Sequence, residues 1–441
     1  MNPDEREDTI LNILLESLEL MSPEHAVRHQ IGLNQQDDDA LFTIFGNDIK
    51  LDKSEKIWVI GSGKASVAMA RAVEEILEDR IADGMVIAPQ IPSGPSQPKR
   101  IQVLKGSHPI PDKESLSSTF ELIEFAKHIP RGSIVLSLIS GGTSALLCMP
   151  GSTIEIEDMG ILHDLLLESG MDIHQMNTIR KTVSEVKAGG LLRHLNQTRL
   201  FDLVISDVPG DLLASIGSGP TCFEQKDFEG TFQLLKQYKL WDKVPHTIRA
   251  YIAKGMKEQT DTQPPELLSH SSTIVSSAGM LARKIADKSE NAGYETEIID
   301  PAYNHPIEEV EQHILKTIRN QPENGKKCFV FYGESSVKVT GGGKGGRNQE
   351  LALRLSRFIQ PDQKMSIACM GTDGVDGPTD AAGAIVDETT LSEANKKNLD
   401  MELFLKNNDS WNFFNQAGGH IKTGPTGNNL MDVVVVLVDQ N

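Results

Sequence analysis

Short runs of aliphatic residues alternate along the chain with longer segments whose apolar residues recur at helical spacing. The segment 56–77, KIWVIGSGKASVAMARAVEEIL, begins as a strand, passes through a glycine turn and ends as a helix. The segment 133–149, SIVLSLISGGTSALLCM, repeats this order. Strands that alternate with helices predict a mainly parallel sheet covered by helices on both faces. In such sheets, ligands bind beyond the carboxyl ends of the strands.

The same alternation predicts the domain organisation. Further elements are expected before residue 225: strands at 84–90, 101–109 and 201–205 and a helix at 116–129. The alternation stops in the polar, proline-bearing stretch 225–270 and resumes at 272. Because 441 residues exceed the size at which one core stops growing, two domains are expected. We predict two Rossmann-like α/β domains, 1–255 and 256–441, each with a mainly parallel or mixed sheet flanked by helices.

Composition narrows the classes of partner. Hydrophobic residues make up 39% of the chain and charged residues 24%, as in globular proteins. The net charge of −19 argues against nucleic acid as a partner, because duplex binding needs a basic face. The longest aliphatic run, 433–438, predicts a buried strand and is far shorter than the ~20 residues of a bilayer span. The acidic N-terminus lacks a secretory core, and the cysteines are scattered, so we expect a cytoplasmic protein without a membrane partner.

The first glycine turn, GSGKAS at 61–66, resembles two phosphate-binding loops without matching either. A Walker A loop would need glycine in place of Trp58 and a hydroxyl in place of Ala65. A dinucleotide fingerprint would need a third glycine in place of Ser66. A turn into a helix N-terminus still offers N–H donors, and Lys64 adds a cation. Gly61, Gly63 and Lys64 are therefore candidate binding residues, and an ordinary turn with an exposed lysine is the alternative.

Two further glycine turns predict anion sites. In SLISGGTSALL, at 137–147, glycines let the backbone approach a ligand, and helix capping is the alternative role of the hydroxyls. The loop 341–347 contains five glycines, which permit closure around phosphate, and it ends in Arg347, whose planar fork suits a carboxylate or a phosphoryl group. A flexible connection is the alternative. The candidate binding residues of these turns are Ser140, Gly141, Gly142, Ser144, Gly345, Gly346 and Asn348.

Acidic turns and one polar helix face complete the candidate chemistry. SDVPGD places Asp207 after a buried strand, and GTDGVDGPTD places Asp373 and Asp376 in another turn. Mg²⁺ needs one or two carboxylates together with substrate phosphates, which either turn could supply, whereas an Asx-turn is the alternative. The segment 174–190 has apolar residues at helical spacing. Its polar face, either solvated or turned toward an anion, holds Asn177, Arg180, Ser184 and Lys187.

Taken together, these motifs resemble the type II glycerate kinases, whose C-terminal half carries the MOFRL module. The resemblance covers almost the whole chain and rests on nine motifs in the family's order, among them GSGKAS, GSHPIPD, SGGTSALL, SDVPGD and KGGRNQELAL. The chain departs from the family pattern at Thr143, Leu212 and Tyr332. The resemblance implies two α/β domains with the active site in the cleft between them, and a catalytic lysine and arginine that correspond to Lys64 and Arg347.

The activity that the resemblance implies is ATP- and Mg²⁺-dependent phosphorylation of D-glycerate, which we expect at the 2-hydroxyl. On this hypothesis Lys64 and Arg347 stabilise the transferred phosphoryl group or hold the glycerate carboxylate, and Asp207 is the candidate base. Asp373 and Asp376 are the candidate Mg²⁺ ligands, and Arg180 and Lys187 join the candidate nucleotide- or substrate-binding residues. Two alternatives stay open, an NAD(P)-dependent hydroxypyruvate reductase and a non-catalytic nucleotide-binding regulator. A homodimer is also left open.

Overall fold

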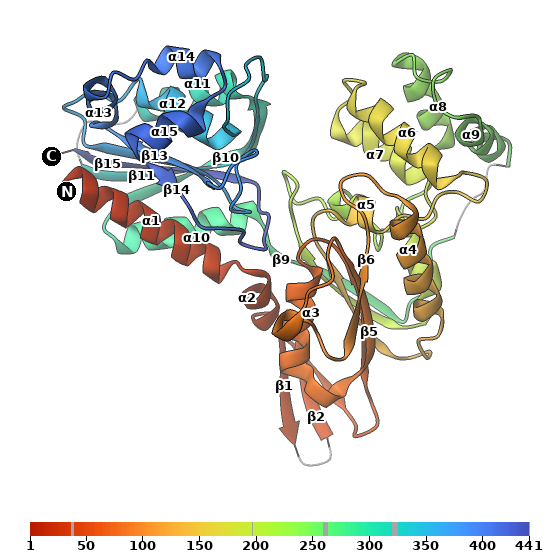
Figure 1. The fold of residues 1–441 in the computed structure, drawn as a ribbon. Coiled ribbons are helices and arrows are strands. Elements are labelled where there is room, and N and C mark those ends of the chain that lie inside the picture. Colours follow the sequence, from red (N-terminus) through yellow and green to blue (C-terminus); the bar gives the residue numbers. More distant parts are fainter. Residues whose placement is uncertain (37–38, 196, 259–262, 320–324, 441) are drawn as a thin grey trace. The chain divides into compact units, whose positions relative to one another are not determined.

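The structure is a computed structural model that describes residues 1–36, 39–195, 197–258, 263–319 and 325–440. The chain divides into two compact units (Figure 1). The N-terminal unit comprises Pro23–Val275, and the C-terminal unit comprises Met1–Ser22 together with Ser276–Asn441. This division differs in two places from the predicted domains, which meet after residue 255. The first helix lies in the C-terminal unit, and the strand that follows residue 268 lies almost entirely in the N-terminal unit.

The N-terminal unit is built on a six-stranded sheet with the strand order β6-β5-β4-β7-β8-β9. The pairs β6–β5, β5–β4, β4–β7 and β7–β8 are parallel, as predicted. All six residues of β7 are buried, which fits a strand in the middle of a sheet that is covered on both faces. The strands are β4 (Ile57–Ser62), β5 (Ile81–Ala88), β6 (Ile101–Lys105), β7 (Ile134–Ile139), β8 (Arg199–Ile205) and β9 (Ser269–Ser276).

Helices surround this sheet and extend into a helical cluster. The cluster has its own apolar core, which includes Leu162, Ile179, Leu235 and Ile248 from α6 to α9. An antiparallel sheet of three strands, β1 to β3, was not predicted. The remaining elements of this unit are α2 (Pro23–Arg28), β1 (Ile31–Gln36), β2 (Asp39–Ile44), β3 (Asn47–Leu51), α3 (Ser66–Leu77), α4 (Lys113–Lys127), α5 (Thr143–Leu146), α6 (Ile156–Leu167), α7 (Ile173–Thr182), α8 (Phe228–Gln237) and α9 (His246–Glu258).

The C-terminal unit contains a second six-stranded sheet with the order β10-β11-β15-β12-β13-β14. Only β10 and β11 pair in parallel, so this sheet is mixed. The predicted valine run forms its central strand β15, and Val433 to Val436 are buried there. The strands are β10 (Glu295–Pro306), β11 (Gly325–Ser336), β12 (Met365–Gly371), β13 (Gly383–Asp387), β14 (His420–Ile421) and β15 (Asp432–Gln440).

The first helix of the chain packs in the C-terminal unit. It begins with a capping box, in which the side chain of Asn2 accepts from the backbone of Glu5 and Glu5 bonds back to Asn2. Its buried Arg6 pairs with Glu388 and donates to Ser366 at 3.2 Å. The helices of this unit are α1 (Pro3–Leu20), α10 (Ala278–Asn291), α11 (Ile307–Arg319), α12 (Arg347–Ser356), α13 (Thr390–Lys396), α14 (Met401–Lys406) and α15 (Ser410–Ala417).

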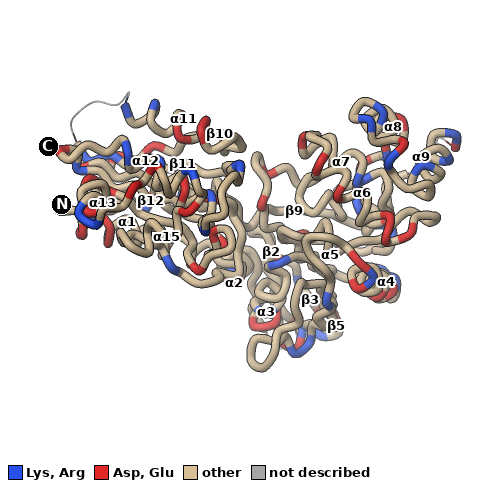
Figure 2. The backbone as a smooth tube through the Cα atoms, turned by 45° about the horizontal axis from the view of Figure 1, so that its top comes forward, with Lys and Arg blue, Asp and Glu red and all other residues tan. Residues whose placement is uncertain are grey.

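Two global properties bear on the choice of partner. Figure 2 shows acidic and basic positions along elements of both units, so charge is not confined to one segment. None of the helices within the described ranges has the length and apolar character needed to cross a bilayer. The segment 174–190, which was expected to be helical, is helical only in its first part, because α7 ends at Thr182 and the chain then turns.

Candidate active site

One pocket of the C-terminal unit contains six of the predicted site residues. It has a volume of about 630 Å³ and is lined by the ends of β10 and β11, the glycine loop, the start of α12 and the acidic turn after β12. The glycine loop and the acidic turn are therefore neighbours, although about 30 positions separate them. The six predicted residues in the lining are Gly345, Gly346, Arg347, Asn348, Asp373 and Asp376.

Arg347 is the first residue of α12, and its guanidinium is held by two carboxylates. Nε and Nη2 donate to the two oxygens of Asp432 at 2.6 and 3.0 Å, and Nη2 also donates to Glu334 at 3.0 Å. The Arg347 side chain is 37% exposed, whereas that of Asp432 is 2% exposed. Asp432 and Glu334 thus fix the guanidinium in one orientation, and the arginine remains accessible from the pocket.

Burial has opposite effects on the two partners. It lowers the pKa of Arg347, but the hydrogen bonds and charge of Asp432, with that of Glu334, outweigh it and raise the pKa overall. Burial raises the pKa of Asp432 to about 7, although the arginine acts against this rise.

The sequence analysis did not identify Asp432 as a site residue. Its position directly before a buried valine run marks it as a residue at a strand end, which is the signal that could have found it.

Asp376 holds the beginning of α12. Its Oδ1 accepts from the backbone and side-chain nitrogens of Asn348 at 3.0 and 3.2 Å, and its Oδ2 accepts from those of Gln349 at 2.8 and 3.0 Å. Burial raises the pKa of Asp376, and these four hydrogen bonds oppose the rise. Because both oxygens are occupied, Asp376 is a positioning residue for Arg347, which directly precedes Asn348 at the start of the helix.

The glycine loop is bound to the turn between α14 and α15. The side chain of Asn408 accepts from the N–H groups of Thr340 and Gly341 at 2.8 and 3.0 Å, and Asp409 accepts from that of Lys344 at 2.8 Å. A Cβ on Gly343 would lie 2.4 Å from that of Asp409. The glycines therefore permit close packing of two backbones. The N–H groups of Thr340, Gly341 and Lys344 are thus engaged within the protein.

Hard oxygen donors for Mg²⁺ remain in this pocket. Asp373 is partly exposed, and its Oδ1 accepts from the N–H of Val375 at 3.1 Å, which leaves Oδ2 available. Glu334 lines the same pocket. Within the described ranges, no three His, Cys, Asp or Glu side chains form a metal-binding group. A site of one or two carboxylates completed by substrate phosphates fits this donor set.

In the N-terminal unit, the glycine turns after β4 and β7 lie against each other. The N–H of Lys64 donates to the carbonyl of Gly141 at 2.8 Å, and that of Ala65 donates to the hydroxyl of Ser140 at 3.0 Å. Gly63 has φ +135°, and a Cβ there would lie 2.1 Å from the Ser140 hydroxyl. The hydroxyl of Ser140 and the backbone of this turn therefore hold the two loops together. Of the turn's polar groups, the side chain of Lys64 is the one left exposed.

Lys64 and Asp207 lie beside the SGG turn. A Cβ on Gly142 would be 3.2 Å from Cγ of Lys64, and a Cβ on Gly141 would be 2.2 Å from a carboxylate oxygen of Asp207. The structure thus brings together Lys64, Gly141, Gly142 and Asp207 at the carboxyl ends of neighbouring parallel strands. Gly61 lies within β4, where a Cβ would be 2.5 Å from the carbonyl oxygen of Leu138, so its role there is packing.

The remaining predicted residues of this unit line a pocket that Gly142 of the SGG turn also lines. Ser144, Arg180 and Lys187 line it, and its volume is about 350 Å³. Lys187 is buried, and its ammonium group donates to the carbonyl of Ser144 at 2.7 Å. The Ser144 hydroxyl lies 3.0 Å from that of Ser218. Because α7 ends before Ser184, Lys187 reaches the pocket from the loop that follows and not from the predicted helix face.

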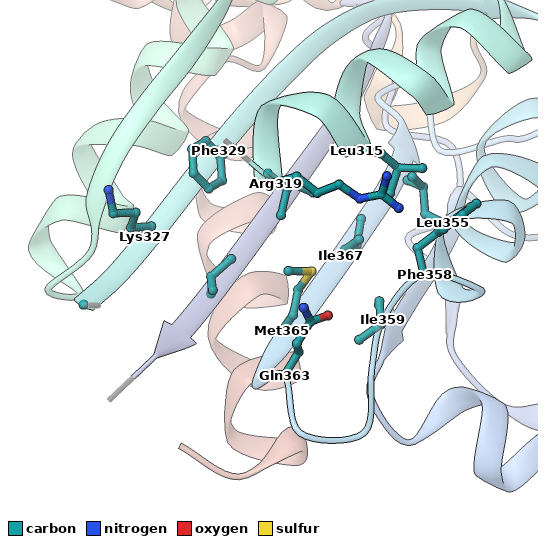
Figure 3. Close-up of a pocket in the computed structure, with 13 residues that line it drawn as sticks. Leu315, Arg319, Lys327, Phe329, Leu355, Phe358, Ile359, Gln363, Met365 and Ile367 are labelled. Atoms are coloured by element: carbon teal, nitrogen blue, oxygen red, sulfur yellow. The ribbon is translucent and has the colours of Figure 1, made fainter. Parts of the chain in front are cut away.

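Another pocket of the C-terminal unit has a different character (Figure 3). Its volume is about 220 Å³, and its lining is mainly apolar, with Phe329, Phe358 and Met365 among the side chains and Arg319 and Lys327 as cations. None of the predicted site residues lines it. We therefore place the candidate chemistry in the other two pockets.

Comparisons with known proteins place both units in one family. Residues 9–253 match a domain of unknown function (DUF4147), and residues 327–432 match the MOFRL family. A glycerate 2-kinase from Pyrococcus horikoshii is 35% identical over 97% of this chain and 96% of its own length. The chain belongs to the glycerate kinase family. A D-glycerate 2-kinase from Thermotoga maritima is 29% identical over 99% of both chains. A crystal structure of glycerate kinase from Thermotoga maritima has a TM-score of 0.84, 28% identity and coverage of 99% of this chain and 100% of that one.

The match to the glycerate kinase family extends through every segment that carries candidate chemistry. The DUF4147 match contains Lys64, Asp207 and the SGG turn, and the MOFRL match contains Arg347, Asp376 and, as its last residue, Asp432. The structure therefore adds a specific contact to the family assignment. The arginine singled out by the resemblance is held by a carboxylate at the far end of the MOFRL segment.

Proposed function

We propose that this protein is a glycerate 2-kinase that transfers the γ-phosphoryl group of ATP to the 2-hydroxyl of D-glycerate, giving 2-phosphoglycerate and ADP. One observation carries the proposal. Arg347 stands oriented in a carboxylate-lined pocket, in a chain that matches glycerate kinases over nearly its whole length. We also propose that the enzyme is cytoplasmic and acts on a small molecule, with no nucleic acid as a partner.

The charged residues take the roles that phosphoryl transfer requires. Catalysis of this kind depends on positioning and on neutralising charge around the transferred group. Lys64 and Arg347 supply the cations. Asp207, beside Lys64 and the SGG turn, is the base for the attacking hydroxyl. Asn348 keeps α12 in place through Asp376. Gly141, Gly142, Gly345 and Gly346 allow close approach of nucleotide or substrate.

Mg²⁺ would be held by the acidic side of the C-terminal pocket. Asp373 has an available carboxylate oxygen and Glu334 faces the same space, whereas both oxygens of Asp376 accept N–H groups. We therefore propose Asp373 and Glu334 as the metal ligands and keep Asp376 as the residue that fixes the helix. When bound, Mg²⁺ supplies neutralisation of phosphate charge.

A coupled ADP-release assay with ATP, Mg²⁺ and D-glycerate tests this function. We expect ADP release that requires D-glycerate, and ³¹P NMR of the product should identify the 2-phosphate. Signal from a 3-phosphate would overturn the assignment of the hydroxyl. Oxidation of NADH with hydroxypyruvate, without ADP release, would favour the reductase. ATP binding without turnover would favour a regulator.

Replacing Lys64 tests its part in the reaction. Lys64→Ala should lower kcat by roughly 10²–10³, as when one preorganised charge-stabilising donor is lost. The melting temperature should hardly change, because the side chain is exposed. Lys113→Ala removes an exposed lysine of the same unit and should leave kcat unchanged. Near-normal turnover of folded Lys64→Ala would exclude the assigned role.

A further inference from the structure

The pocket of about 350 Å³ in the N-terminal unit combines apolar walls with basic side chains. Met159, Leu162 and Leu166 of α6 supply much of the apolar lining. The basic side chains come from four separate segments: His108 after β6, His163 on α6, Arg180 on α7 and Lys187 in the loop that follows. Asp and Glu do not occur among its lining residues in the described part of the chain. The sequence motifs had drawn attention only to Arg180 and Lys187.

Arg180 is the least compensated of these groups. Burial lowers the pKa of its guanidinium. Within the described ranges, no carboxylate or carbonyl accepts a hydrogen bond from it. A guanidinium with five N–H donors that loses water without gaining a partner is costly. Its neighbour Lys181, by contrast, forms an ion pair with Glu224 at 2.5 Å. The cost of Arg180 would be offset by an anion in the pocket.

The other basic groups increase this positive potential. Lys187 is buried and donates to the carbonyls of Ser144 and Leu147 at 2.7 and 3.4 Å, so its contacts there are uncharged acceptors. Burial lowers the pKa of Lys187, the nearby Cys148 thiol acts against this, and Arg180 lowers it further. Charges of one sign in a poorly solvated space repel each other strongly.

Burial and neighbouring positive charges also lower the pKa values of the two histidines. Burial lowers the pKa of His163, as do the charges of Arg180 and Lys187, whereas Asp164 has the opposite effect. Burial also lowers the pKa of His108, together with the charges of Lys64 and His163. Charge repulsion connects these residues in a series from Lys64 to Lys187, and the carboxylate of Asp164 opposes it at His163.

We propose that this pocket is an oxyanion site, in which Arg180, His108 and His163 bind a carboxylate or a phosphoryl group against the apolar wall of α6. The planar fork of Arg180 matches either group, and the buried side chains of Met159 and Leu162 form an apolar wall beside it. The identity of the anion rests on the proposed function, which offers the carboxylate of D-glycerate and the phosphates of ATP. His108 and His163 are thereby assigned to substrate binding.

Three probes, each added alone, identify the anion: D-glycerate, ATP and inorganic phosphate. Thermal-shift and calorimetric titrations should show binding of at least one probe to the wild-type protein. Arg180→Gln should weaken that binding by roughly 10- to 100-fold, the cost of losing a charge-assisted hydrogen bond. Lys181→Gln, the adjacent residue with its own acidic partner, should stay within about twofold of wild type.

Kinetics separate the two sources. A rise in KM for D-glycerate alone assigns the carboxylate, and a rise in KM for ATP alone assigns a phosphate. Without ligand, Arg180→Gln should melt at the wild-type temperature or above, because it removes a poorly compensated charge. A folded Arg180→Gln protein with wild-type affinity for every probe and unchanged KM values would overturn the proposal.

Histidine NMR gives a readout that does not depend on turnover. Binding of the anion should raise the pKa values of His108 and His163, and the signals of the exposed His174 should not respond to the probe. Unmoved signals of both pocket histidines at saturating probe would also overturn the proposal. The two hypotheses fail separately. Anion binding without ADP release contradicts the kinase, whereas ADP release with unchanged KM values in Arg180→Gln contradicts the oxyanion site.

Discussion

At the residue scale, Arg347 shows how one side chain can be both structural and reactive. Asp432 and Glu334 take up Nε and Nη2, so the orientation of the guanidinium is fixed before any substrate arrives. Such preorganisation avoids reorganisation during the reaction. A lysine keeps the charge and loses the planar fork, and it would leave Asp432 buried with a poorer partner.

We therefore expect Arg347→Lys to lose most of the activity that Arg347→Ala loses, roughly 10²–10³ in kcat. Steady-state kinetics of ADP release measure both variants. Arg357→Lys, which replaces a surface arginine just beyond α12 that pairs with Glu311 and Glu402, is the matched control and should keep wild-type turnover. Activity of Arg347→Lys near the wild-type value would show that charge alone matters.

At the scale of elements, the glycine loop is positioned by the turn between α14 and α15. A Cβ on Gly343 would lie 2.6 Å from the carbonyl oxygen of Asn407, whereas a Cβ on Gly342 would meet nothing within 4 Å. Gly343→Ala should therefore destabilise the protein by about 1–3 kcal/mol and lower kcat/KM by displacing the start of α12. Chemical denaturation and kinetics test this. Gly342→Ala should be close to wild type in both, and equal behaviour of the two variants would mean that packing does not set the loop.

At the scale of the whole molecule, the first helix ties the beginning of the chain to the C-terminal unit. Arg6 has a side chain with 0% exposure and pairs with Glu388, so removing it leaves a largely buried carboxylate. We expect Arg6→Ala to lower the free energy of unfolding by roughly 3–5 kcal/mol. Arg28→Ala breaks an exposed pair with Glu75 and should cost less than about 1 kcal/mol. Similar denaturation midpoints for the two variants would refute this assignment of α1.

The sequence by itself determined many of the elements and their local order, although not the antiparallel sheet β1 to β3. Aliphatic runs predicted β4 and the buried strands β7 and β15, and the glycine turn after β4 predicted α3, because these patterns depend on neighbouring residues. The candidate residues of the C-terminal pocket were also found from the sequence, since glycine-rich and acidic turns mark strand ends. The resemblance of the motifs then pointed to the family to which the chain belongs.

Only the tertiary structure decided which distant residues meet. Asp432 binds Arg347 across 85 positions, and the turn after α14 holds the glycine loop across more than 60. Neither contact can be predicted from the local periodicity of the sequence, because the order of the strands and the packing of the loop bring these residues together. The same reason explains why Asp376 positions a helix, and why His108 and His163 share a pocket with Arg180. The hydrophobic pattern specifies the secondary structure of each segment, and tertiary packing specifies which groups lie next to each charged side chain.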